Sequence, residues 1–463
     1  MAMPISRTTK VVSLVRQLGT AAQAATPTGN TKPSLKKQNV SNIVIVDGVR
    51  TPFLQSGTEY KNMQAHDLLK SAFVGLLHRT EVPVKEVDYV VAGTVIQEVK
   101  TANVAREVRT WNETFQTPCH TVTLACISSN VAITNCIGML AAGQCDVAIA
   151  GGVETMSDVP IRFSRKLRQT MLSMNKAKSV GARLGLMTNF FVPKNLMPEL
   201  PGVTEFSTNE TMGSSGDRLA AQFGVTRKEQ DEFALRSHTF AQQAYDAGNL
   251  KDLIPVYVPG RDTAVLKDNG VRVTPMDKLS KLKPAFVKPH GTVTPANSSF
   301  LTDGASACLL MTEEKAKQLG YKPLAYLRDF VYVAQDPKDQ LLLGPAYATP
   351  KVLEKAGLKL SDIDVFEYHE AFAGQLLAVI KAMDSDAFAK NYMGRTNKVG
   401  LIPMEKLNLW GGSVSIGHPF GATGVRLCMH AAHRLHKENG QFALVAACAA
   451  GGHGHGIIIE RCP

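Results

Sequence analysis

At 463 residues, with 44% hydrophobic and 20% charged side chains, the chain is long enough to bury a large core in two or three structural units. No apolar run approaches the roughly 18 residues that span a bilayer, and eight cysteines in this length are too sparse for a disulfide scaffold, which predicts a reducing compartment. The formal net charge of +11 falls to +5 (11 − 6) without the six basic residues of the first 46 positions, so nucleic acid is not a predicted partner.

The first 46 residues contain no Asp or Glu, carry six basic residues and are rich in Ser and Thr. The run 11–16, Val-Val-Ser-Leu-Val-Arg, is amphipathic but too short for the apolar centre of a secretory signal. This composition predicts a mitochondrial transit peptide over residues 1–38. A disordered basic tail is the alternative reading.

Strand-like and helix-like segments then alternate along the first half of the chain. Apolar runs at 42–47, 87–93 and 145–152 read as buried strands, and the segments 68–77 and 126–142 read as helices. Alternating strands and helices predict parallel pairing in an α/β sheet.

The second half repeats this order. A helix is expected to begin at Thr349, the strand 364–369 resembles 88–93, and 440–446 resembles 143–149, with a helix before each member of the last pair. The repeated order predicts two related α/β halves that face each other.

A different pattern separates the halves, roughly from Thr155 to Lys288. Thr226 and Glu229 form a capping box that opens a helix running to about Ala247. The stretch 159–198 holds eight basic and no acidic residues among Met, Leu and Phe. It could contact phosphates, a membrane surface or an acidic partner, and a solvated basic loop is an equally good reading. The insertion is expected to cover an active site.

Cys126 stands where the strand-like segment 121–125 meets a helix. A thiol at a helix N-terminus is expected to favour the thiolate, and the free N–H groups there can bind an oxyanion. A single cysteine is more often a buried structural residue. The small and polar neighbours of Cys126 favour the reactive reading.

Two glycine-rich motifs in the second half supply the groups that would work with Cys126. Gly417-His418-Pro419 precedes Phe-Gly-Ala-Thr-Gly, and Cys448 precedes Gly451-Gly452. An imidazole there can pair with a thiolate or donate a hydrogen bond to an enolate oxygen, and a second thiol can exchange protons. The three side chains together indicate acyl transfer through a thioester on the protein.

The chain resembles the thiolases from Asn42 to Glu460. The matching stretches are 47–53, 151–157, 291–305, Gly417-His418-Pro419 and Cys448. Tyr368-His369-Glu370-Ala371-Phe372, where most thiolases have Asn in place of His369, and the basic insertion are most similar to the mitochondrial thiolases for long-chain 3-ketoacyl-CoA.

The resemblance implies a role for each matching residue. Cys126 would be the acylated nucleophile, His418 would activate it, and Cys448 would be the acid and then the base. His369 and His418 would form one oxyanion hole, and the N–H groups of Cys126 and Ala450 a second one. Ser299 and Phe372 would contact CoA.

The resemblance also implies the architecture and the setting. The fold would be a layered α-β-α-β-α core, with an N-terminal thiolase half over 39–313, an inserted loop domain at about 156–288, and a C-terminal half over 314–463. The function would be that of a 3-ketoacyl-CoA thiolase of fatty acid β-oxidation, an acyltransferase that uses CoA as co-substrate and no permanently bound cofactor. The partners would be acyl-CoA, a second copy in a homodimer, an alpha subunit with hydratase and dehydrogenase activities, and the matrix side of the mitochondrial inner membrane.

Two rival functions stay open. A ketoacyl synthase could use Cys126, His369 and His418, although it has no need of Cys448. A lipid-carrier or scaffold subunit could keep the fold without the chemistry. No metal is expected, because Cys448, His453 and His455 lack a fourth ligand. A dinucleotide fingerprint is missing at Gly417, and three further histidines are expected to face solvent, namely His430, His433 and His436.

Overall fold

The computed structural model describes residues 32, 35–36, 40–108, 117–202 and 204–463. Almost all of the predicted transit peptide, 1–38, lies outside the described residues. The transit peptide therefore remains a prediction. Contacts group residues 35–463 into one unit, which is the part considered below. Within the described ranges, every helix is too short or too polar to cross a membrane.

One mixed sheet runs through this unit in the strand order β4-β3-β5-β6-β1-β7-β10-β9-β8. The first five strands in that order are β4 (Cys119–Val122), β3 (Tyr89–Gly93), β5 (Val147–Glu154), β6 (Thr302–Thr312) and β1 (Ile43–Arg50). The others are β7 (Ala325–Ala334), β10 (His453–Arg461), β9 (Phe442–Ala449) and β8 (Val365–Tyr368), and β2 (Leu54–Gln55) pairs with β6. The two parts of the sheet join where β1 pairs with β7.

Parallel pairing is confined to the strands that a helix connects, so the prediction of a parallel sheet is only partly right. Strand β3 is parallel to β4 and β5, and β8 is parallel to β9, whereas the other pairs of the sheet are antiparallel. Strand β10 follows β9 after a three-residue turn, which can only produce an antiparallel neighbour.

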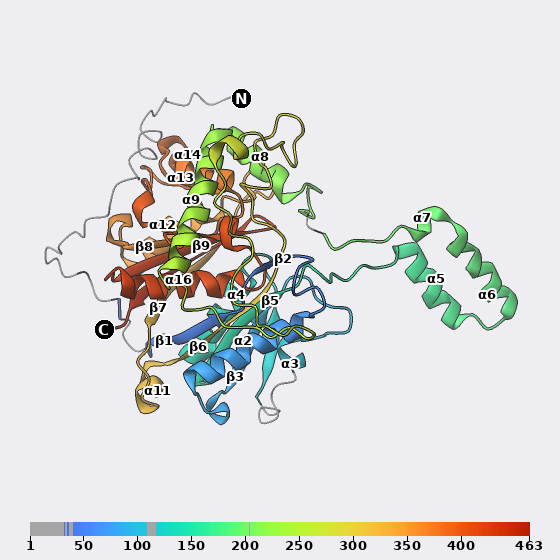
Figure 1. The fold of residues 1–463 in the computed structure, drawn as a ribbon, viewed down its shortest axis with the longest axis horizontal. Helices are drawn as coiled ribbons and strands as arrows, with labels where there is room; N and C mark the ends of the chain where they lie inside the picture. The colour runs from blue at the N-terminus through green and yellow to red at the C-terminus, as the bar shows by residue number, and fades with distance from the viewer. Residues whose placement is uncertain (1–31, 33–34, 37–39, 109–116, 203) are drawn as a thin grey trace. The chain divides into compact units, whose positions relative to one another are not determined.

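The two halves repeat the unit strand–helix–strand, as β3-α4-β5 and β8-α16-β9 (Figure 1). Helices α4 (Ser128–Ala141) and α16 (Thr423–Lys437) pack against each other between the two parts of the sheet. Helix α2 (Ala65–Thr80) covers the outer face of one part, and α12 (Gly344–Ala356) covers that of the other. Three apolar clusters fill the interfaces. The layered α-β-α-β-α arrangement of two duplicated halves is confirmed.

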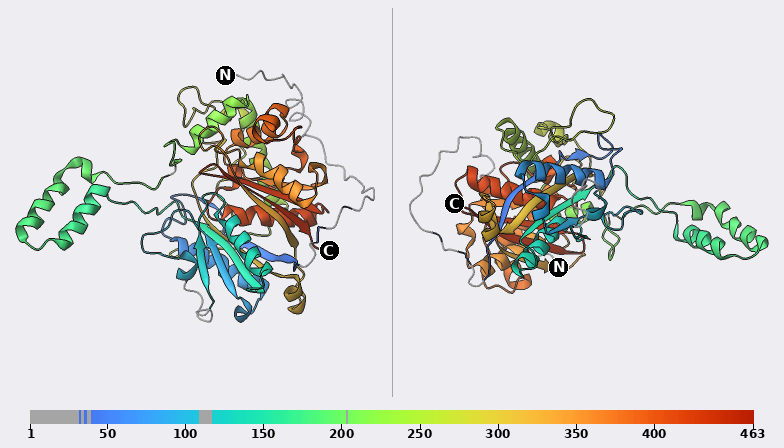
Figure 2. Two further views of the ribbon diagram at one scale, coloured as in Figure 1. Left: turned by 180° about the vertical axis from the view of Figure 1, so that it is seen from behind. Right: turned by 90° about the horizontal axis from the view of Figure 1, so that it is seen from below.

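The insertion between β5 and β6 has two parts. Helices α5 (Arg165–Lys176), α6 (Val180–Met187) and α7 (Pro193–Leu196) contact one another in a helical hairpin, which lies apart from the sheet (Figure 2). Helices α8 (Met212–Gln222) and α9 (Arg227–Asp246) pack instead on α13 (Ala373–Met383). Helix α9 begins after the predicted capping box and ends within one residue of the predicted position.

The remaining elements are short. They are α3 (Val104–Glu107), α10 (Met276–Leu279), α11 (Glu313–Gln318), α14 (Asp386–Tyr392), α15 (Ser413–Ile416) and the 3₁₀ turns η1 (Val84–Glu86), η2 (Thr188–Phe191), η3 (Leu360–Asp362) and η4 (Met404–Lys406). The helix expected from Thr349 begins earlier, at Gly344, because Pro345 occupies its first turn, where a missing N–H costs nothing.

Candidate active site

Cys126 lies on the loop between β4 and α4, two residues before the helix begins. The residue before it, Ala125, has φ +44°, a left-handed conformation that is costly for a residue with a side chain. The hydroxyl of Ser128 holds this loop, since it accepts a hydrogen bond from the N–H of Leu124 (2.9 Å) and donates one to the carbonyl of Ala125 (2.7 Å). The sequence correctly places Cys126 at a strand-to-helix junction but wrongly makes it the first helical residue.

His418 follows α15 and the left-handed Gly417 (φ +112°), and its N–H donates to the hydroxyl of Thr302 (3.0 Å). Its Nδ1 lies 2.7 Å from the hydroxyl oxygen of Thr423, which donates its own proton to the carbonyl of Pro419 (3.0 Å). Thr423 therefore accepts from Nδ1–H, and the lone pair of His418 is on Nε2. This buried Nε2 has no hydrogen-bond partner in the described part of the chain.

His369 follows β8, and its hydrogen-bond partner lets it take the opposite tautomer. Its Nδ1 lies 3.0 Å from the hydroxyl oxygen of Ser413, which accepts a hydrogen bond from Nη2 of Arg426 (2.9 Å). Because arginine only donates, the proton of Ser413 is available for Nδ1 of His369, and the ring proton is then on Nε2. That Nε2 is also buried and without a partner among the described atoms.

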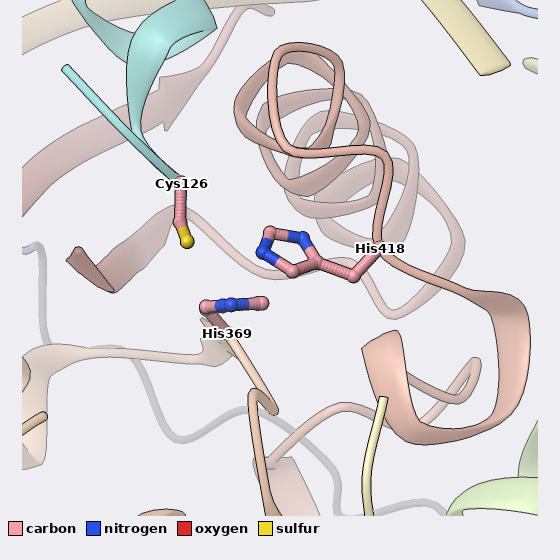
Figure 3. A group of neighbouring side chains, drawn as sticks. All are labelled: Cys126, His369 and His418. Carbon is pink, nitrogen blue, oxygen red and sulfur yellow. The ribbon is translucent and has the colours of Figure 1, made fainter. Parts of the chain in front are cut away.

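The thiol and the two imidazoles converge (Figure 3). The rings of His369 and His418 have centroids 4.1 Å apart, and the ligand atoms of the three side chains all lie within 4.8 Å of one another. Across the described ranges this is the one group of His, Cys, Asp or Glu that could hold a metal ion, so Cys448, His453 and His455 do not form such a group. The three atoms are suited equally to passing protons, and the absence of a resident metal stays a prediction.

Cys448 and Ala450 approach Cys126 from the end of β9. Cys448 is buried, and this burial, followed by the charge of the Cys126 thiolate, raises the pKa of Cys448, as expected of two neighbouring thiols. The N–H of Ala450 and that of Cys126 both act on the sulfur of Cys126 and lower the pKa of its thiol. The two predicted donors of the second oxyanion hole therefore face the same atom.

The electrostatics contradict the expected thiolate. Burial raises the pKa of Cys126 to about 12, although the N–H groups of Ala450 and Cys126 act in the opposite direction. Burial, and then the charge of Arg426, lowers the pKa of His369 to about 3. Burial, followed by His369 and Arg426, also holds the pKa of His418 well below its usual value. The resting site is a neutral thiol beside two neutral imidazoles, because desolvation outweighs the helix dipole.

Glu154 is a buried carboxyl near Cys126 to which the sequence alone assigns no role. At the end of β5 it accepts hydrogen bonds from the N–H groups of Val95 (3.1 Å), Ile96 (2.9 Å) and Gly421 (3.0 Å). Burial raises its pKa to about 8. Glu154 links the loop before α16 to the first half of the chain. Its position in the motif Gly-Gly-Val-Glu was the sequence signal that could have identified it.

Ser299 and Phe372, the predicted CoA contacts, lie next to each other. Both the N–H and the hydroxyl of Ser299 donate to the carbonyl of Ala371 (3.0 and 2.9 Å), and Ser298 forms a bridge with Phe372. Phe372 is buried edge-on against Phe286. Their contact with CoA remains a prediction.

The histidines of α16 correct a further expectation. His436 is exposed and bonds the carbonyl of Leu324 (2.7 Å), but His430 is fully buried 3.5 Å from a carboxylate oxygen of Asp252. Helix α16 lies in the central layer, so most of its surface meets protein rather than solvent.

Comparison with known proteins gives one consistent family. Residues 43–314 match the N-terminal domain of thiolases, and residues 321–461 match the C-terminal domain. The human "Trifunctional enzyme subunit beta, mitochondrial" is 66% identical over 434 residues, 94% of this chain and 91% of that protein. The "Probable 3-ketoacyl-CoA thiolase" of Caenorhabditis elegans is 60% identical over 436 residues, 94% and 97% of the two chains.

Solved structures show the same fold. Human mitochondrial 3-ketoacyl-CoA thiolase in complex with CoA has a TM-score of 0.76 and 29% identity, covering 91% of this chain and 98% of that one. The acetyl-CoA acetyltransferase of Bacillus anthracis has a TM-score of 0.78 and 32% identity, covering 91% and 99%.

Proposed function

The chain belongs to the thiolase family and is an acyltransferase of the 3-ketoacyl-CoA thiolase type, and we propose that it cleaves its substrate through an acyl-Cys126 intermediate. The observation that carries the proposal is the convergence of one thiol and two buried imidazoles, to which the Nδ1 partners assign opposite tautomers. His418 offers a lone pair on Nε2, and His369 offers an N–H on the same side.

Acylation begins with the neutral thiol. The proton of Cys126 moves to Nε2 of His418 while the sulfur attacks the 3-keto carbon, because neither ion would be stable alone in this buried site. The negative oxygen formed at that carbon is stabilised by the N–H groups of Cys126 and Ala450. The same groups already act on the sulfur, since they lower the pKa of its thiol.

The bond between carbons 2 and 3 then breaks. Its electron pair passes into the enolate of acetyl-CoA, whose oxygen is stabilised by Nε2–H of His369 and the newly protonated Nε2 of His418. Cys448 gives its proton to carbon 2, and acetyl-CoA leaves. The acyl group, two carbons shorter than the substrate chain, stays on Cys126 as a thioester.

The second half returns every proton. The thiolate of Cys448 takes the proton of incoming CoA, whose sulfur attacks the thioester. The Cys126 sulfur leaves and recovers its proton from His418. Two separate acyl transfers predict ping-pong kinetics.

The rival synthase has no use for Cys448, which stands beside Cys126 in this site. The experiment is to supply the purified chain with 3-ketopalmitoyl-CoA and CoA and to quantify acetyl-CoA. Wild type should release acetyl-CoA together with a shortened acyl-CoA, and Cys448→Ser should lose this activity. Decarboxylation of malonyl-CoA by wild type without thiolysis would establish the synthase instead.

The setting follows from the relatives that the chain resembles. Their names, mitochondrial and "subunit beta", support a mitochondrial location and a complex with a second kind of chain, for which the proposed partner carries hydratase and dehydrogenase activities. Strand β4 is an edge strand whose four residues are all partly exposed, and an open edge suits pairing with a second copy. Light scattering should give twice the mass of the chain, and copurification tests the second partner.

The helical hairpin supports a peripheral contact with the inner membrane on its matrix side. The stretch 159–198, which contains the hairpin, holds eight basic residues. It also holds apolar side chains that are more than half exposed, which are Ile161, Phe163, Leu172, Val180, Leu184, Phe191, Leu196 and Met197. Basic and apolar side chains together suit an anionic lipid surface better than a solvated loop.

Sedimentation with phosphatidylcholine vesicles, with and without phosphatidylglycerol, tests this contact. The double variant Phe163→Ser/Phe191→Ser should bind the anionic vesicles at least roughly tenfold more weakly, since burying each aromatic side chain contributes about 1.5–3 kcal/mol. Tyr257→Ser, which removes a side chain that is 76% exposed outside the hairpin, is the matched control and should bind as wild type does. Equal binding by wild type, the double variant and Tyr257→Ser would show that the hairpin does not contact the membrane.

A further inference from the structure

Glu205 touches the turn that carries the second oxyanion hole. It lies just beyond the helical hairpin, and its side chain accepts a hydrogen bond from the N–H of Gly451 (2.7 Å). Gly451 follows Ala450, whose own N–H acts on the sulfur of Cys126 and lowers the pKa of that thiol. One residue of the insertion thus holds the peptide next to the catalytic donor.

The carboxylate is held in place from its own side. Glu205 is only 6% exposed, and its Oε1 accepts hydrogen bonds from the N–H (3.2 Å) and the hydroxyl (2.8 Å) of Ser207. Its backbone closes a small loop, because its N–H donates to the carbonyl of Glu210 (2.8 Å) and its carbonyl accepts from Asn209 (2.8 Å). Burial opposes ionisation, but the bonds from Ser207 and Gly451 and the nearby His453 leave the pKa of Glu205 below its usual value.

The turn itself needs such an anchor. Residues 450–452 connect β9 to β10, and Gly451 and Gly452 both take left-handed conformations (φ +83° and +70°). Two consecutive glycines give the backbone wide freedom. The carbonyl of Gly452 accepts from the N–H of Gln335 (2.8 Å), which fixes one end of the turn, and Glu205 fixes the other.

We propose that Glu205 is a positioning residue that fixes the turn 450–452, so that the N–H of Ala450 points at the sulfur of Cys126. The inference rests on the proposed function only for its effect on turnover. Without the carboxylate, the Ala450–Gly451 peptide can rotate, and the sulfur and the tetrahedral oxygen lose part of one donor. The insertion then contributes directly to the chemistry.

The test measures the reactivity of Cys126 and turnover separately, in the full chain. Iodoacetamide labelling of Cys126 is followed by mass spectrometry as a function of pH. Glu205→Ala removes the carboxylate and Glu205→Asp withdraws it. At any one pH below the pKa of Cys126, both should label about tenfold more slowly, because a weaker interaction with the thiolate lowers the thiolate fraction. The kcat for thiolysis should fall about tenfold, part of the 10²–10³ that full loss of an oxyanion donor costs, with KM changed less than about twofold.

Two controls make the outcomes decisive. Glu205→Gln keeps an oxygen that can accept from Gly451 and should recover most of both quantities. Glu229→Gln changes another glutamate of the insertion that accepts a backbone N–H, from Thr226 (2.6 Å), and should behave as wild type. If Glu205→Ala does not fold, Glu205→Asp carries the test.

Wild-type labelling and kcat in a folded Glu205→Asp or Glu205→Ala protein would overturn the inference. Labelling needs no substrate, so it is independent of thiolysis. If the Glu205 variants change the labelling of Cys126 but wild type shows no thiolysis, the proposed function is contradicted and the inference stands.

Discussion

The two histidines of this site differ in what their Nδ1 atoms meet, and that difference assigns their roles. Thr423 accepts from His418, whereas Ser413, which accepts one bond from Arg426, keeps its hydroxyl proton free to donate to His369, and we assign it that role. One imidazole becomes a base and the other a donor without either being charged. Neutral partners suit a site from which water is largely excluded.

Ser413→Ala tests this assignment. Without the hydroxyl, nothing selects the tautomer with the proton on Nε2 of His369, and the enolate loses a donor for part of the time. We expect kcat to fall at least about tenfold towards the 10²–10³ of a lost donor, with little change in KM. Ser413→Thr, which keeps the hydroxyl, should recover most of the rate, and a failure to do so would show that packing rather than the hydrogen bond matters.

The buried neutral state of His369 predicts a pH dependence of stability. Its pKa is about 3 in the folded chain and about 6.5 in the unfolded chain, so only the unfolded chain takes up this proton as the pH falls below 6.5. The neutral His369 therefore contributes to the free energy of unfolding above pH 6.5, and this contribution is lost as the pH falls towards 3.

Urea unfolding at pH 8 and pH 5 measures the effect. His369→Asn lacks the titrating group, so wild type should lose about 2 kcal/mol more than the variant between the two pH values. An equal loss in both proteins would mean that His369 is already charged or solvated in the folded state.

At the scale of elements, close backbone contacts hold the two halves together beside the site. A Cβ added to Gly152 on β5 would lie 1.8 Å from the carbonyl oxygen of Gly421, just before α16. The same loop is held by Glu154. The approach of β5 to this loop therefore depends on a missing side chain.

Gly152→Ala should destabilise the protein by about 3 kcal/mol, since backbone atoms cannot yield to the new methyl group. Gly138→Ala on helix α4 is the control, because a Cβ there meets nothing within 4 Å, and helix propensity should stabilise it by up to about 1 kcal/mol. Thermal melting compares the two. Similar melting temperatures would show that the halves can separate locally at no cost.

Sequence patterns predicted most of these elements, and the exceptions have physical causes. Periodicity located the strands and the capping box of α9 because both are local signals. The antiparallel pairs were missed because pairing depends on how strands connect in space. The buried state of His430 and the high pKa of Cys126 were missed because burial comes from distant elements that pack around them. The contact of Glu205 with Gly451 spans 246 positions and leaves no local pattern.

At the scale of the whole molecule, duplication brings the reactive groups together. Cys126 precedes α4 in one half, and His418 precedes α16, the equivalent helix of the other half. Since these helices pack against each other in the central layer, their preceding loops meet. The family resemblance therefore predicted the catalytic set that periodicity alone could not assemble.

The helical hairpin should be separable from the chemistry. Arg162 and Glu199 at its base are paired by two backbone hydrogen bonds (3.0 and 2.8 Å), so a short glycine turn can replace residues 164–197. We expect thiolysis of a soluble substrate within about twofold of wild type, because one lost surface element leaves Glu205 and the core intact. Vesicle binding should be lost. A large fall in kcat with an unchanged melting temperature would show that the hairpin contributes to catalysis.

The most direct test is mass spectrometry of the chain after incubation with 3-ketopalmitoyl-CoA in the absence of CoA, with Cys126→Ser as the control. Cleavage through acyl-Cys126 predicts an acyl adduct on that residue that is two carbons shorter than the substrate chain and is discharged when CoA is added. A full-length adduct, an adduct on another residue, or none on Cys126 would contradict cleavage through acyl-Cys126.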